Sequence, residues 1–187
     1  MPVNLESCKC KVEFTSKIAR GNRGQIDTRG ALSLPSQLIA VQGRIVTDTP
    51  PVHDPRQIAA FLDGVVPDRR SADARTLDDL FRMTTGWQPC LWPAGILGYG
   101  SYRYTYDSGH SGVSLATGFA PRKAKMVVYI MPGYANFGEV LARLGPHKLG
   151  KACLYLGALS KLDMPALEEL IRAGLNDLER RWPVSPS

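Results

Sequence analysis

Hydrophobic and polar positions alternate most clearly in a tyrosine-rich segment near the middle of the chain. Tyr102, Tyr104 and Tyr106 occupy every second position, so their rings would share one face of an extended strand. Turn-forming residues follow directly at 107–109. The pattern predicts an antiparallel hairpin whose second strand returns through 115–119.

Helical spacing of apolar residues occurs on both sides of this hairpin. Runs with apolar residues three or four positions apart follow Asp54, Pro67 and Asp163, and another ends at Gly145. Two more strands are predicted at 125–131 and 153–156. The element order is α-α-β-β-β-α-β-α, which is typical of an α+β fold. We expect a mainly antiparallel sheet of about four to five strands with the helices packed on one face.

The chain divides near its fiftieth residue. Phe14 is the only aromatic residue before that point, and such a segment lacks the side chains that build a core. We therefore predict that residues 1–50 are a disordered or loosely attached extension. The domain is predicted to cover 51–182, and 183–187 to form a tail.

Composition is that of an ordinary globular protein, with 44% hydrophobic and 21% charged residues. No run approaches the roughly 18 apolar residues of a membrane span, and the first residues lack the order of a secretory signal. The formal charge of +6 is spread along the chain without a nucleic-acid motif. We expect neither a nucleic-acid nor a membrane partner. The four scattered cysteines predict reduced thiols and a cytoplasmic location.

Cationic residues in two predicted loops form the candidate binding site. One loop follows the return strand, and the other precedes the strand at 153–156. Glycine, lysine and arginine in loops can bind a phosphate or carboxylate group. A small anionic ligand could bind there if both loops meet beside the tyrosine row; the alternative is that the charges only solubilise the turns. The candidate residues are Arg122, Lys123, His147, Lys148, Lys151, Tyr102 and Tyr104.

Catalytic and metal-binding patterns are not evident. His53, His110 and His147 have no nucleophile or base beside them in the sequence. Cys90 and Cys153 are each interpreted as a small buried hydrophobic residue. Acidic residues of the second and last predicted helices lie four positions from arginines, the spacing of surface ion pairs. We predict no catalytic residue, no metal ligand and no cofactor from these patterns.

Several motifs occur together in one order, at 98–104 (GYGSYRY), 118–123 (GFAPRK), 129–132 (YIMP) and 144–155 (LGPHKLGKACLY). Together they resemble the YdhG-like bacterial domains of unknown function, from about Pro55 to about Arg172. The resemblance implies a small α/β sandwich similar in shape to frataxin. One member of that family is described as an intracellular iron chaperone, so iron is the one cofactor that the resemblance implies. Ala120 and Ala152 stand where the family often has serine, which removes two hydroxyl groups.

The sequence therefore favours a non-catalytic intracellular protein that binds a small anionic ligand. Two alternatives stay open. The family resemblance allows an iron-delivery protein, and the absence of a catalytic motif also allows a protein–protein interaction module.

Overall fold

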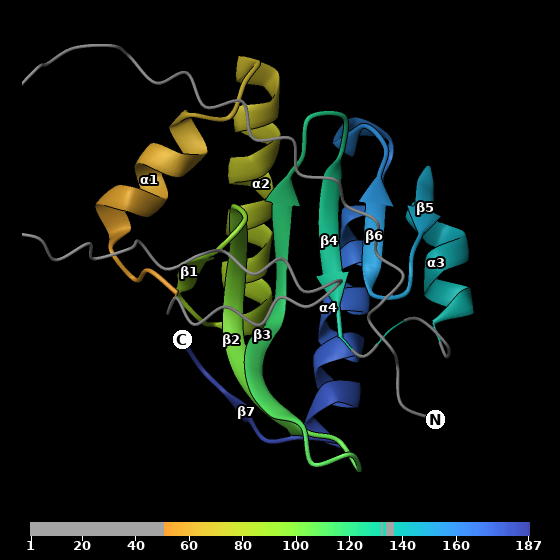
Figure 1. Ribbon diagram of the computed structural model, residues 1–187. Coiled ribbons are helices and arrows are strands. Elements are labelled where there is room, and N and C mark those ends of the chain that lie inside the picture. The colour runs from red at the N-terminus through yellow and green to blue at the C-terminus, as the bar shows by residue number, and fades with distance from the viewer. Residues whose placement is uncertain (1–50, 132, 134–136) are drawn as a thin grey trace, which may run out of the picture.

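The computed structural model describes residues 51–131, 133 and 137–187 (Figure 1). The predicted extension, 1–50, lies outside the described residues. The elements are α1 (Pro55–Asp63), α2 (Asp68–Thr85), β1 (Pro89–Trp92), β2 (Ile96–Thr105), β3 (Ser111–Pro121), β4 (Met126–Ile130), α3 (Gly138–Leu144), β5 (His147–Leu149), β6 (Cys153–Leu156), the short 3-10 helix η2 (Leu159–Lys161), α4 (Met164–Glu179) and β7 (Val184–Ser185).

The helix boundaries follow from side chains that satisfy free backbone groups. Asp54 Oδ1 accepts a hydrogen bond from Arg56 N at 2.9 Å, and Asp163 Oδ1 accepts one from Ala166 N at 2.9 Å. Gly86 ends α2 with a φ of 73°, a left-handed conformation that glycine adopts without steric cost. The helices predicted from these positions are confirmed.

The tyrosine-rich hairpin is also confirmed. Strands β2 and β3 pair antiparallel, with Tyr102 opposite Ser114 and Tyr104 opposite Gly112. The ring centroids of Tyr102 and Tyr104 lie 6.0 Å apart, and those of Tyr104 and Tyr106 lie 5.0 Å apart. The three rings therefore share one face of the strand.

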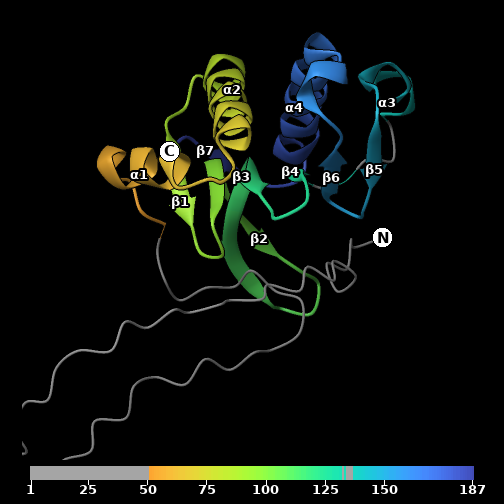
Figure 2. The same ribbon diagram turned by 90° about the horizontal axis from the view of Figure 1, so that it is seen from above.

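The predicted arrangement of sheet and helices is wrong in two respects. The antiparallel sheet has seven strands in the order β1-β2-β3-β4-β6-β5, with β7 beside β2, rather than about four to five. The helices do not simply pack on one face: α2 and α4 contact the sheet, whereas α1 lies beside α2 and the edge strand β1, and α3 lies against α4 (Figure 2). The short strands β1, β5 and β7 were not predicted. Their residues carry no strand pattern, and they are strands because their backbone groups form hydrogen bonds with a neighbouring strand.

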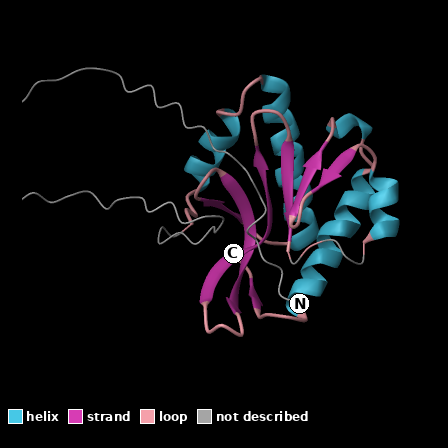
Figure 3. Ribbon diagram, turned by 45° about the vertical axis from the view of Figure 1, so that its right-hand side comes forward, coloured by secondary structure: helices cyan, strands magenta, loops and turns pink. Residues whose placement is uncertain are grey.

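Two hydrophobic clusters lie on opposite faces of the sheet. The larger one joins the apolar sides of the helices to alternate residues of the strands, among them Leu97, Phe119 and Leu154. The strands form one layer beside the helices (Figure 3). We call the face turned away from α2 and α4 the outer face. Its buried residues are Cys90, Trp92, Ile96, Leu115, Ala120, Val127, Tyr129 and Cys153.

Within 183–187, which were expected as a tail, Val184 and Ser185 form the strand β7 of the sheet. Val184 pairs with Tyr102, and Ser185 pairs with Ser101. The backbone N–H of Gly100 donates to Ser187 Oγ at 3.0 Å. This C-terminal segment therefore covers the edge of β2 next to the end of β1.

Candidate functional site

The two predicted cationic loops lie at opposite ends of β4. Arg122 and Lys123 form the β3–β4 turn, which leads into β4. Lys151 lies in the β5–β6 turn, next to Ala152, whose carbonyl accepts a hydrogen bond from Ile130 N at the far end of β4. The loops therefore do not meet around one site.

The other candidate residues lie away from both of these turns, in the core and on the edge strand β5. Tyr102 and Tyr104 are 5% and 6% exposed and belong to the helix-side core, where Trp182 packs 5.5 Å from the ring of Tyr102. Burial raises the pKa of the Tyr102 phenol. His147 and Lys148 lie on β5, the last strand of the sheet. The candidate residues are thus spread over both ends and both faces of the sheet, and anion binding stays a prediction.

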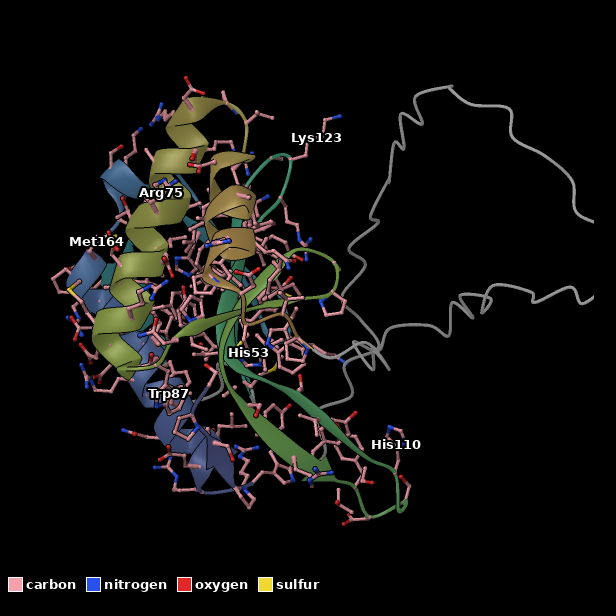
Figure 4. All side chains as sticks on the ribbon, turned by 90° about the vertical axis from the view of Figure 1, so that its left-hand side faces the viewer. His53, Arg75, Trp87, His110, Lys123 and Met164 are labelled. Atoms are coloured by element: carbon pink, nitrogen blue, oxygen red, sulfur yellow. The ribbon has the colours of Figure 1, made fainter. Side chains whose placement is uncertain are left out.

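Several cations nevertheless gather around the β3–β4 turn. The guanidinium of Arg70, near the start of α2, donates to the backbone carbonyls of Arg122 and Lys123. The turn is closed by a hydrogen bond from Arg122 N to Lys125 O at 3.0 Å. Lys123 lies at one end of the sheet and His110 at the other (Figure 4). We call Arg70, Arg122, Lys123 and Lys125 the cationic turn.

From this turn the side chain of Arg122 reaches onto the outer face. Its Nη1 donates to Ala94 O at 2.6 Å, and its Nη2 donates to Tyr129 Oη at 3.0 Å. In the described part of the chain, Arg122 Nε is buried without a partner, and so is Trp92 Nε1. Buried N–H groups in native proteins almost always have one, so both donors require an explanation. Trp92 was not among the residues predicted from the sequence.

A thiol–imidazole contact is a further feature that the sequence did not reveal. Val52 pairs with Leu91 and places His53 beside Cys90, with 3.1 Å between Sγ and Nδ1. Burial raises the pKa of the Cys90 thiol, and a hydrogen bond with Ser187 acts in the opposite direction. A protonated thiol donates a hydrogen bond but is a poor nucleophile. The contact joins the segment before α1 to β1.

A buried polar cluster joins α2 to β2. Tyr99 Oη donates to Asp78 Oδ1 at 2.5 Å, and Arg82 Nε lies 3.0 Å from both carboxylate oxygens. Asp78 is only 7% exposed. Burial, together with the charge of Asp78, raises the pKa of Tyr99. The Asp78 carboxylate therefore links α2 to β2 through its hydrogen bond with Tyr99.

Three acidic side chains of the helices, Asp78, Glu168 and Asp177, form ion pairs with arginines on the same or the adjoining turn. The predicted ion pairs of Arg82, Arg172 and Arg181, each with the carboxylate four residues before it, are confirmed. Arg75 instead pairs with Asp63 on α1. Across 51–131, 133 and 137–187, no three histidine, cysteine or acidic side chains gather as a group that could hold a metal ion.

Within that same described part, no helix combines the length and the apolar character needed to cross a membrane.

Comparisons with known proteins leave the family undecided. No family model, no curated protein and no solved structure matches the chain. The YdhG-like resemblance accordingly stays a prediction from its motifs.

Proposed function

We propose that this protein binds a small anionic molecule at the cationic turn, without catalysing a reaction on it. The observation that supports this most directly is the position of Arg70, whose guanidinium ties the start of α2 to the β3–β4 turn. Side chains from two segments distant in sequence thereby reach one end of the sheet.

The charges at this end support an anion as the ligand. The backbone carbonyls that Arg70 binds are neutral, so its positive charge adds to those of Arg122, Lys123 and Lys125 at this end of the sheet. The first two turns of α2 carry two acidic residues, Asp68 and Asp73. The start of a helix also carries a partial positive charge. An anion bound here would receive charge-assisted hydrogen bonds, which are stronger than neutral ones.

Iron delivery and protein–protein interaction remain the alternatives from the sequence. In the part of the chain that the structure describes, the exposed large apolar residues are Val66, Met83, Val113 and Leu149, and they come from separate segments. No specific contact among the described residues supports iron delivery or protein–protein interaction.

The test is a nuclear magnetic resonance titration of the ¹⁵N-labelled full chain at constant ionic strength. Sodium phosphate, sodium benzoate and ferrous iron are added in separate experiments. We expect at least one of the anions to shift the amide signals of residues 69–70 and 122–125. Replacing Lys123 and Lys125 together by alanine should weaken that binding about tenfold, the effect of losing one charge-assisted hydrogen bond.

A matched control removes the same charge elsewhere. Lys148 and Lys151, replaced together by alanine, lie away from the cationic turn and should leave the affinity unchanged. Equal weakening by both double variants would mean that only net charge matters. If neither anion shifts the amide signals of the β3–β4 turn, the proposal is refuted. Shifts caused by iron alone would favour the iron-delivery alternative.

A further inference from the structure

The buried residues of the outer face all belong to strands. They come from β1, β2, β3, β4 and β6, and no residue of the four described α-helices is part of this cluster. The buried apolar side chains of those helices belong to the larger cluster instead. Side chains on a sheet face stand roughly perpendicular to the strands, and they stay partly in water unless another layer packs on them. Each member of the outer-face cluster is nevertheless at most 5% exposed.

The two largest side chains show that the cluster is not covered by its own members. Large rings can cover small neighbours such as Ala120 and Val127, but a ring in the outermost layer would itself face water. Trp92 and Tyr129 are each only 5% exposed. Trp92 Nε1 is also buried, and it has no hydrogen-bond partner among the described residues. The outer face therefore requires a further layer that brings both apolar side chains and hydrogen-bond acceptors.

The described chain begins at the edge of this face. The backbone N–H groups of Val52 and Leu91 each donate to the other residue's carbonyl at 2.8 Å. The imidazole of His53 lies 3.1 Å from Sγ of Cys90, a member of the outer-face cluster. The chain that precedes residue 51 therefore starts from the rim of the outer face.

The sequence just before this point has the composition of a buried β-segment. Six of the nine residues at 38–46 (LIAVQGRIV) are apolar, and four of those six are β-branched. No charged residue occurs from 30 to 43. Such a segment gains free energy when its apolar side chains pack on an apolar face. Its backbone carbonyls are also acceptors for a buried donor such as Trp92 Nε1.

The length of this segment is sufficient to cross the face. Four strand spacings separate β1 from β6, which is about 19 Å in total. Nine residues span up to about 30 Å when extended, and the link at 47–50 reaches up to about 13 Å. A short link also holds the segment at a high effective concentration beside the face. This favours the chain's own segment over a separate molecule as the layer.

We infer that residues 38–46 pack on the outer face and complete the core on that side of the sheet. The rest of 1–50 is not part of this inference. The proposed function does not depend on this layer, because the cationic turn lies at an end of the sheet and not on its face.

Nuclear Overhauser effects in the full chain test this contact directly. The protein is labelled at the methyl groups of isoleucine, leucine and valine. Methyl groups of Ile39, Val41 and Ile45 should show these effects with the ring protons of Trp92 or Tyr129. Ring currents should also move their signals away from the positions of an unfolded chain. Methyl groups of 38–46 that show no contact with the outer face would overturn the inference.

The reactivity of Cys153 toward iodoacetamide measures the layer itself. This residue is 3% exposed, so the folded parent chain should react slowly at this thiol and quickly in urea. Mass spectrometry of peptides follows the site separately from the other cysteines. Ile39→Asp combined with Val41→Asp places two charges in the packed segment. This double variant should react at least about tenfold faster at Cys153, because charges are costly to bury without partners.

A matched control places the same two charges earlier in the chain. Leu5→Asp combined with Val12→Asp should leave Cys153 as slow to react as in the parent chain. Equal acceleration by both double variants would overturn the inference, because the position of the charges would not matter. Protection that persists in the first double variant would mean that another layer covers the face, and protection that disappears on dilution would mean that a second copy does. If the first double variant does not fold, the Overhauser effects of the parent chain decide the question.

Discussion

Asp78 is a carboxylate buried between a helix and the sheet, and its partners determine what it contributes. Tyr99 Oη donates to it at 2.5 Å, while Arg82 supplies the compensating charge. Tyr99 is fully buried and stacks on Phe81 at a centroid distance of 4.8 Å. The phenol is therefore held both by a hydrogen bond and by packing.

Replacing Tyr99 by phenylalanine should lower the free energy of unfolding by about 1–3 kcal/mol, because Asp78 loses one partner while it stays buried. Urea unfolding followed by circular dichroism measures this loss. Tyr106→Phe is the matched control, since its ring is only half-buried, and it should change stability by less than about 0.5 kcal/mol. Equal losses in the two variants would contradict the role of the Asp78 contact.

The same tyrosines predict how stability depends on pH. Burial raises the pKa of both Tyr99 and Tyr102 in the folded state. Above about pH 10, tyrosines of the unfolded chain lose their protons while these two keep theirs. The unfolded state then binds fewer protons, so stability falls as the pH rises through this range.

This fall should be smaller for Tyr99→Phe than for the parent chain, as measured by urea midpoints between about pH 8 and about pH 11. Tyrosinate absorbance of the folded protein should show fewer ionising groups than the seven tyrosines of the sequence. Ionisation of all of them before unfolding would contradict the prediction.

At the scale of elements, two glycines at helix ends differ in the backbone conformation that they must adopt. Gly86 follows α2 with a φ of 73°, and Gly138 begins α3 with no such constraint. An added Cβ would meet nothing within 4 Å at either position. Any difference between the two alanine variants therefore comes from the backbone and not from crowding.

Gly86→Ala should destabilise the protein by about 1–2 kcal/mol, the cost of a left-handed conformation for an L-residue. Gly138→Ala should stabilise it by about 0.4–1 kcal/mol, because alanine loses less conformational entropy on folding. Thermal unfolding of both variants beside the parent chain measures the contrast. A neutral Gly86→Ala would show that α2 does not depend on this ending.

At the scale of the whole molecule, the C-terminal segment connects parts that lie far apart in sequence. Val184 and Ser185 pair with β2, and Ser187 Oγ both accepts from Gly100 N and donates to Gln88 O. Trp182, just before this segment, packs on the rings of the tyrosine row. The segment therefore joins the end of α4 to β1 and β2.

Removing residues 183–187 should lower the free energy of unfolding by roughly 1–3 kcal/mol, because β2 loses backbone partners and part of its cover. The near-ultraviolet circular dichroism should change as well, since Trp182 loses its anchor. Ser187→Ala removes only the two hydrogen bonds of Oγ and keeps the pairing of β7, so it should cost less than the truncation. An unchanged unfolding midpoint after truncation would mean that β7 is not needed for stability.

The elements that the sequence predicted are those specified by local chemistry. Asp54 and Asp163 mark helix starts through bonds to backbone groups two or three residues away. Gly86 marks a helix end, and the alternating tyrosines mark a long strand. Such signals depend on neighbours in sequence, so a single chain suffices to read them.

The short strands, the position of the helices relative to the sheet and the polar contacts of the outer face were decided only by tertiary structure. Cys90 and His53 are 37 positions apart and meet because Val52 pairs with Leu91. Arg122 was predicted as a loop cation, but its bond to Tyr129 and the unpaired indole of Trp92 depend on which strands are adjacent and in which register. Strand register is set by the packing of the whole sheet, and it brings these distant polar groups together.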